Sequence, residues 1–147
     1  MADEMVLDTN VLSELMRPQP ASQVVAWFDG KAETAFFITA ITRAEILLGI
    51  DLLPAGRRRD ALTEAATRMF VQDFGGRCLA FDEHAAGIYA RVVGDRTRAG
   101  QPISTEDAEI AAISLLHGLP LVTRNVKDFD NITGLRVVNP WGSDGEQ

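Results

Sequence analysis

The sequence predicts an α/β fold in which helices cover both faces of a parallel β-sheet. Short apolar segments rich in β-branched residues alternate with longer segments of helical periodicity along all 147 residues. Hydrophobic residues make up 46% of the chain, which is enough for a substantial core. No internal repeat, low-complexity block or Pro/Gly/Ser-rich linker divides the chain. We therefore expect a single domain over residues 1–147.

The first elements follow from apolar runs and the breaks between them. The run at 5–7 is expected to be a short buried strand, followed by a helix over about 11–16. The segment RPQP at 17–20 breaks that helix. The segment 21–30 is expected to be a short helix, because it has helical spacing and a glycine at its end. Residues 34–40 are β-branched and aromatic, which predicts a second strand.

Two helices, a strand and a third helix are expected in the middle of the chain. The segment 42–53 and the longer segment 57–74 have the apolar spacing of helices. The short apolar segment at 77–81 predicts the third strand. Asp82 is expected to cap a helix that runs to about Thr97.

The last third begins with a loop at 98–102 and a helix at 104–117. Gly118 closes this helix, with a proline two residues later. The segments 119–123 and 135–140 complete the expected sheet as its fourth and fifth strands.

Composition excludes several kinds of protein. The single cysteine, Cys78, excludes an internal disulfide framework and fits a reducing compartment. Together with two histidines it cannot build a typical structural zinc site. The formal net charge of −7 argues against a broad DNA-coating surface. No apolar run spans a bilayer, and the acidic start MADEM does not fit a signal peptide, so we expect a cytoplasmic protein with no membrane association.

Four carboxylates follow or precede the expected strands at one edge of the sheet. Asp8 follows the first strand, Glu45 follows the second, and Asp128 comes shortly after the fourth. Asp107 lies in the first turn of the helix that leads into the fourth strand. That helix must run antiparallel to the strand it feeds, so Asp107 is expected at the same edge. Binding sites in parallel sheets form beyond the carboxyl ends of the strands.

Helix capping explains each acid by itself. Asp8 fits an N-cap, and Thr42 with Glu45 and Ser104 with Asp107 have the spacing of a capping box or nearly so. Capping does not explain the polar residues expected at the same edge, which are Asn10, Thr123 and Asn125. Converging acids repel one another unless a cation is bound. Oxygen ligands of this kind suit Mg²⁺, which favours phosphodiester hydrolysis as the chemistry.

Four segments of the chain resemble the PIN-domain ribonucleases of the VapC type. These segments are LDTNVLSELMRP, TRAEILLGI, DAEIAAISLLHGLPLVTRNVKDFDNI and LRVVNPW, and they span the chain from about Met5 to Trp141. The first and last are similar to the FitB and plasmid-stability branch. The resemblance implies a PIN-like three-layer α/β/α fold with a four- or five-stranded parallel sheet, usually dimeric.

The resemblance also implies roles for individual residues. It places Asp8, Glu45 and Asp107 at the three main acidic positions and Asp128 at a more variable fourth. Asn10 and Thr123 match the family's supporting polar positions. The implied activity is that of an endoribonuclease toxin, with Mg²⁺ or Mn²⁺ held by Asp8 and Asp107. The implied partners are an RNA substrate, a second copy in a homodimer, and a VapB-like antitoxin that binds DNA in complex with the toxin.

Two other functions remain compatible with the residues alone. One is a metal-dependent phosphatase or hydrolase on a similar sheet, and the other is a non-catalytic DNA-associated regulatory module. Several arginines have open roles: the cluster Arg57–Arg59 is a solvated helix start or a contact for RNA or antitoxin. Arg91, Arg96 and Arg98 are candidates for phosphate contact or surface solvation. Arg43 and Arg124 flank the acids and are candidates for RNA binding or acid pairing.

Overall fold

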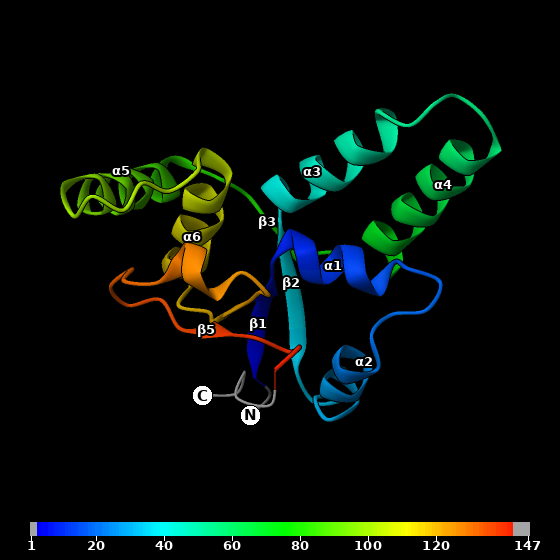
Figure 1. The fold of residues 1–147 in the computed structure, drawn as a ribbon, viewed down its shortest axis with the longest axis horizontal. Helices are drawn as coiled ribbons and strands as arrows, with labels where there is room; N and C mark the ends of the chain where they lie inside the picture. Colours follow the sequence, from blue (N-terminus) through cyan, green and yellow to red (C-terminus); the bar gives the residue numbers. More distant parts are fainter. Residues whose placement is uncertain (1–2, 143–147) are drawn as a thin grey trace.

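Strands and helices alternate as the sequence predicts in the computed structural model, which describes residues 3–142 (Figure 1). The strands are β1 (Glu4–Leu7), β2 (Ala35–Thr39), β3 (Cys78–Leu79), β4 (Leu121–Val122) and β5 (Val137–Val138). The helices are α1 (Thr9–Leu15), α2 (Ser22–Asp29), α3 (Ala40–Asp51), α4 (Arg57–Gln72), α5 (Glu83–Arg98), α6 (Thr105–His117) and the 3₁₀ helix η1 (Val126–Phe129). The predicted α/β class is confirmed.

The five strands form one parallel sheet with the order β3-β2-β1-β4-β5. The central strand β1 pairs with β2 on one side and with β4 on the other. The chain fills one half of the sheet first and then crosses to the other, so the order reverses between β1 and β4. Ligand sites in parallel sheets form at such a reversal, beyond the carboxyl ends of the strands.

The two faces of the sheet are covered by different helices, which gives three layers (Figure 1). Met5 and Leu7 of β1 pack in the core cluster that includes residues of α1, α2, α3 and α4. Val6 points to the opposite face and packs with residues of α5, α6 and η1. Alternate residues of a strand face opposite sides, so an uninterrupted apolar run is what a strand buried on both faces requires.

Local capping signals position several helices as expected. The side chain of Asp82 accepts hydrogen bonds from the backbone N–H groups of His84 and Ala85, at 3.1 and 3.0 Å. The Oγ of Ser104 accepts from the backbone N–H of Asp107 at 3.1 Å. Gly118 ends α6 with a left-handed φ of 66°, a conformation that glycine adopts without steric cost.

The structure differs from the expectation at several boundaries. Helices α1 and α3 each begin two residues earlier than predicted, directly after Asp8 and Thr39. Strands β3, β4 and β5 contain only two residues each, although the apolar runs that hold them are longer. The 3₁₀ helix η1, which carries Asp128, was not expected, because a four-residue turn has too few residues to show a period.

Helices α3 and α4 form a hairpin that projects beyond the sheet (Figure 1). Leu48 of α3, Leu52 at the C-cap of α3 and Val71 of α4 are large hydrophobic residues left exposed. The helices of residues 3–142 include no span long and apolar enough to cross a membrane.

Candidate active site

Asp8 lies directly after the central strand and is almost completely buried, at 4% exposure. Its backbone N–H donates to the carbonyl of Val122 at 2.9 Å, which continues the β1–β4 pairing. Its carbonyl accepts from the N–H groups of Val11 and Leu12 and so begins α1. Asp8 is therefore the N-cap of α1 by position. Among the backbone N–H groups of α1, however, its side chain accepts only from that of the adjacent Thr9, at 2.9 Å, whereas a capping side chain usually accepts from N2 or N3.

The second carboxylate oxygen of Asp8 is held from across the sheet. The hydroxyl of Thr123 donates to Oδ2 at 2.7 Å, and the amide of Asn10 donates to the same atom at 3.2 Å. The Thr123 hydroxyl also accepts from the Asn10 amide and from the backbone N–H of Asn125. One donated and two accepted bonds use its whole hydrogen-bonding capacity. Asn125 thus contributes through its backbone, whereas Asn10 and Thr123 contribute side chains.

Glu45 is anchored to the helix that follows Asp8. The hydroxyl of Thr9 donates to Oε1 of Glu45 at 2.6 Å, and the Thr9 and Thr42 hydroxyl oxygens lie 2.9 Å apart. Thr9 has one hydroxyl proton and gives it to Glu45, so the fully buried Thr42 must donate to Thr9. The result is a chain of two hydroxyls that ends on the Glu45 carboxylate.

The capping-box interpretation of Thr42 and Glu45 is wrong. The N-cap of α3 is Thr39, whose hydroxyl accepts from the N–H of Thr42 at 3.1 Å. Glu45 therefore lies in the second turn of α3, where the helix N–H groups already have partners within the helix. Its carboxylate is directed to α1 instead.

Asp107 lies in the first turn of α6 and is half buried. Burial, together with the negative charges of Asp8, Asp128 and Glu45, raises its pKa from an ordinary 3.8 to about 6. The hydrogen bond with Ser104 opposes this shift. The charges of all three other acids therefore act on the pKa of Asp107, although even Asp128, the nearest of them in sequence, is 21 residues away.

Burial also raises the pKa of Asp8, and the charge of Glu45 adds to this effect. The hydrogen bonds from Thr123, Thr9 and Asn10 stabilise the carboxylate and oppose the shift, but they do not overcome the loss of solvation. The surroundings therefore make the ionised forms of Asp8 and Asp107 less stable. A bound cation would stabilise both carboxylates.

Asp128 is exposed in η1 and is positioned through its backbone. The buried Arg96 of α5, at 7% exposure, donates to the carbonyls of Asp128 and Asp130 at 3.2 and 2.9 Å. It also donates to the carbonyl of Gln101 at 2.7 Å, in the loop that leads to α6. The interpretation of Arg96 as a surface or phosphate-contacting residue is wrong, because three backbone carbonyls occupy its guanidinium.

The chemistry of the donors fits a hard divalent cation. Oδ1 of Asp8 accepts one hydrogen bond and retains a second acceptor position, while Oδ2 accepts two. Within residues 3–142 no three Asp, Glu, His or Cys side chains are already grouped as a metal cage. Mg²⁺ does not require such a cage, since one or two carboxylates with water and phosphate oxygens suffice.

The two arginines that flank the acids in sequence both lie against aromatic rings. Arg43 is 4.8 Å from the ring centroid of Phe70, and Arg124 is 4.9 Å from that of Trp141. The backbone N–H of Arg124 also donates to Oδ1 of Asn10 at 3.1 Å. Arg124 therefore orients a supporting residue of the site through its main chain.

Sequence reasoning missed Thr9 and Thr42 as supporting residues. A hydroxyl directly after Asp8 and another three residues before Glu45 were the available signals, because residues three apart share a helix face. The contact between them joins residues 33 apart in sequence and depends on how α1 packs near α3.

Comparison with known proteins gives a family match over most of the chain. The model of the PIN domain family matches residues 5–135. The plasmid stability protein StbB of Pseudomonas syringae is 39% identical over 136 residues, which cover 92% of this chain and 97% of StbB. Toxin FitB of Neisseria gonorrhoeae is 40% identical over 136 residues, with the same coverage of both chains. A protein of Sinorhizobium fredii called VapC ribonuclease Y4jK is 36% identical over 136 residues, covering 92% of this chain and 96% of its own.

Solved structures agree with the sequence relatives. A structure of FitAB bound to an IR36 DNA fragment has a TM-score of 0.84 and 38% identity, with 94% of this chain and 96% of that chain covered. A crystal structure of FitAcB from Neisseria gonorrhoeae has a TM-score of 0.83 and 39% identity, with 93% and 98% covered. The three-layer α/β/α fold with its parallel sheet is thus shared with these proteins. From the family match over residues 5–135, together with relatives of about 40% identity along nearly their whole length, the chain belongs to the PIN domain family.

Proposed function

We propose that this chain is a metal-dependent endoribonuclease that acts as the toxin of a toxin–antitoxin pair. The observation that carries the proposal is geometric: Thr123 and Asn10 hold the buried carboxylate of Asp8 at the carboxyl end of β1, and Thr9 holds that of Glu45 after β2. In support, the charges of Asp8, Asp128 and Glu45 contribute to raising the pKa of Asp107 to about 6. Acids that repel one another at the switch point of a parallel sheet are suited to binding a cation and a phosphate. The similar proteins called VapC ribonuclease and toxin FitB support RNA as substrate and toxicity as the biological effect.

The proposal assigns each acid a role. Asp8 and Asp107 are the residues that would hold Mg²⁺ or Mn²⁺, while Glu45 and Asp128 complete the negative charge and orient water. When bound, the cation supplies Lewis-acid chemistry: it neutralises charge on the phosphate and lowers the pKa of water. Thr123 and Asn10 fix the direction of the Asp8 carboxylate, and Thr9 fixes that of Glu45.

The test is cleavage of RNA by the purified chain. Wild-type protein with Mg²⁺ or Mn²⁺ should cleave single-stranded RNA, and chelation or the substitution Asp8→Asn should abolish cleavage. Hydrolysis of free nucleotides or sugar phosphates in place of RNA would make the chain a phosphatase instead. Binding of DNA by the isolated chain, without any cleavage, would favour a regulatory module.

We also infer that a small antitoxin covers the acids. The similar solved structure of FitAB is bound to an IR36 DNA fragment, which supports a partner that binds DNA as part of the complex. An arginine of that partner could replace the charge of the cation and pair bidentately with two carboxylates. Co-expression with a small DNA-binding protein encoded by a neighbouring gene should give a stable, inactive complex. A complex that cleaves RNA as fast as the free chain would contradict inhibition at this site.

The proposal also covers the domain organisation, the cellular location and the oligomeric state. The chain acts as one PIN domain in the cytoplasm and pairs with a second copy of itself. A molar mass of twice the 16.0 kDa chain in light scattering would support the homodimer.

A further inference from the structure

A cleft lies beside Glu45, between α1, α3 and α4. Its volume is about 340 Å³, and its lining includes Thr9 and Glu45. Arg17, just after α1, and Arg58, in the first turn of α4, also line it. The cleft therefore places two basic side chains and part of the acidic site around one space.

The basic side chains of this cleft have donors available for a phosphate. Arg58 is exposed, and no ion pair involves it within residues 3–142. Its neighbours Arg57 and Arg59 complete the only dense basic cluster of a chain whose net charge is −7. A positively charged cluster of this kind on an otherwise acidic protein attracts an anionic ligand.

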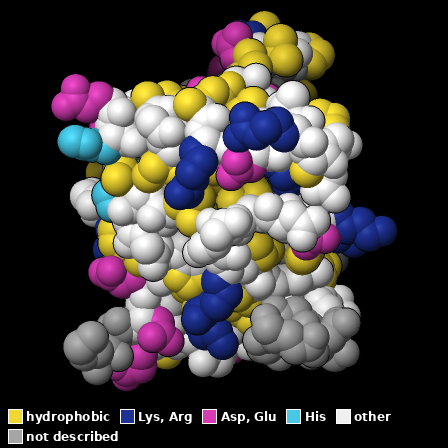
Figure 2. Space-filling view, turned by 90° about the vertical axis from the view of Figure 1, so that its left-hand side faces the viewer, with side chains coloured by type: hydrophobic (Ala, Val, Ile, Leu, Met, Phe, Trp, Pro, Cys, Tyr) yellow, Lys and Arg dark blue, Asp and Glu magenta, His cyan; other side chains and the backbone are white. Residues whose placement is uncertain are grey.

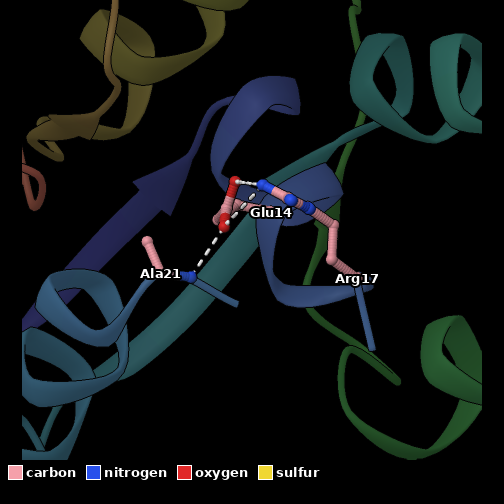
Figure 3. A network of polar contacts seen from close by, with 3 residues as sticks. All are labelled: Glu14, Arg17 and Ala21. Atoms are coloured by element: carbon pink, nitrogen blue, oxygen red, sulfur yellow. Dashed lines mark hydrogen bonds and ion pairs between the residues drawn. The ribbon is translucent and has the colours of Figure 1, made fainter. Parts of the chain in front are cut away.

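Arg17 is held in place by a buried acid (Figure 3). The side chain of Glu14 is only 8% exposed and accepts from the backbone N–H of Ala21 at 2.7 Å and from Nη1 of Arg17 at 3.2 Å. These contacts lower the pKa of Glu14, so the acid stays ionised and keeps its partner. The Arg17 side chain itself is 65% exposed. A guanidinium has five N–H donors, and the contact with Glu14 uses only one of its nitrogens.

The apolar part of the lining comes from α3, α4 and the loop between them. The aliphatic residues of this lining are Ile46, Ile50, Leu53 and Leu62. Aliphatic surface in a cleft that is also lined by two cationic side chains matches a nucleotide, which combines an uncharged base with an anionic phosphate. On the face that carries α5, by contrast, the basic side chains are scattered, and an acidic side chain lies beside the upper ones (Figure 2).

We propose that this cleft binds a nucleotide that flanks the scissile phosphate of a single-stranded RNA, with its phosphate at Arg17 and Arg58. The inference rests on the proposed ribonuclease function and adds the path of the substrate to it. Arg58 supplies charge, Arg17 supplies a directed pair of donors, and the shared wall at Thr9 and Glu45 makes the path continuous with the acids.

The experiment compares Arg58→Ala with Arg68→Ala in the full-length chain. Arg68 lies on the same helix and is exposed, but it does not line the cleft, so it controls for the loss of one charge. Binding of a fluorescent oligouridylate is measured by anisotropy in metal-free buffer over a range of salt concentrations. Cleavage of the same RNA with Mg²⁺ gives kcat and KM separately.

Arg58→Ala should weaken RNA binding several-fold and raise KM with little change in kcat. It should also reduce the slope of log affinity against log salt by about 0.7, the value for one phosphate contact on a single strand. Arg58→Lys should retain most of the binding, and Arg68→Ala should behave as wild type.

Equal effects of the Arg58 and Arg68 substitutions, or no effect of either, would overturn the assignment. So would an Arg58→Ala variant that binds RNA normally but no longer holds the antitoxin, since the cleft would then be a protein-binding groove. Absence of cleavage by wild type, with the difference in binding preserved, would refute the ribonuclease function and leave the RNA-binding cleft in place.

Discussion

The hydroxyl of Thr9 donates a 2.6 Å hydrogen bond to Oε1 of Glu45, which ties the helix after β1 to the helix after β2. Thr9 directly follows Asp8, so one short segment carries the buried acid and orients the second acid. The buried Thr42 hydroxyl donates to Thr9 and fixes the direction of this bond. The two acids are therefore positioned as a pair.

Thr9→Val should reduce RNA cleavage by about 10- to 100-fold, the usual effect of removing an outer hydrogen-bonding partner at a metal site. Valine keeps the shape of threonine but leaves the Glu45 carboxylate without its donor. Thr9→Ser restores the hydroxyl and should recover most of the activity. Kinetics at several Mg²⁺ concentrations measure the effect, and equal activity of the valine and serine variants would exclude this role for Thr9.

Asp8→Asn should remove both cleavage and most of the stabilisation by metal. Asparagine is a good N-cap, so a role in capping alone predicts little change. A lost ligand predicts a smaller metal-induced shift, since saturation at a hundredfold excess over Kd stabilises the native state by about 2.7 kcal/mol. Thermal melting with and without Mn²⁺ gives the comparison, and an Asp8→Asn protein with the full shift and full cleavage would return Asp8 to a capping role.

Asp107→Asn should stabilise the metal-free protein at pH 7 but not at pH 4. The pKa of Asp107 is about 6 in the folded protein and 3.8 ordinarily. The folded state therefore binds this proton more tightly, so ionisation of Asp107 destabilises the fold as the pH rises from about 4 to 6. The difference in melting temperature between variant and wild type should appear across this window. A difference that does not depend on pH would contradict an electrostatic origin.

Arg96→Met should lower stability by about 2–4 kcal/mol, because three carbonyls lose a charged donor in a buried position. Arg98→Met is the matched control two residues away. Arg98 is exposed and pairs with Asp95 at the surface, and its removal should cost less than about 1 kcal/mol. Urea unfolding of both variants measures the free energies, and similar losses would mean that Arg96 does not hold the Asp128 turn.

The sequence alone determined the alternation of strands and helices, the caps at Asp82 and Ser104, and the glycine end of α6. These features depend on neighbours within a few residues, through strand and helix periodicity and local hydrogen bonds. It also indicated which acids lie at the carboxyl edge, because a parallel sheet sends every strand end to one side.

Only the tertiary structure decided how those acids are held. The bond between Thr123 and Asp8 joins residues 115 apart and exists because β4 lies beside β1, a strand order that periodicity does not specify. The hydrogen bond between Thr9 and Glu45 likewise depends on tertiary structure, because it forms only when α1 packs near α3. Arg96 and Arg98 have the same chemistry two residues apart, yet one is buried on backbone carbonyls and the other is exposed. A helix turns by about 100° per residue, so side chains two residues apart point to nearly opposite sides of the helix. The packing of the surrounding chain determines which of the two meets the core.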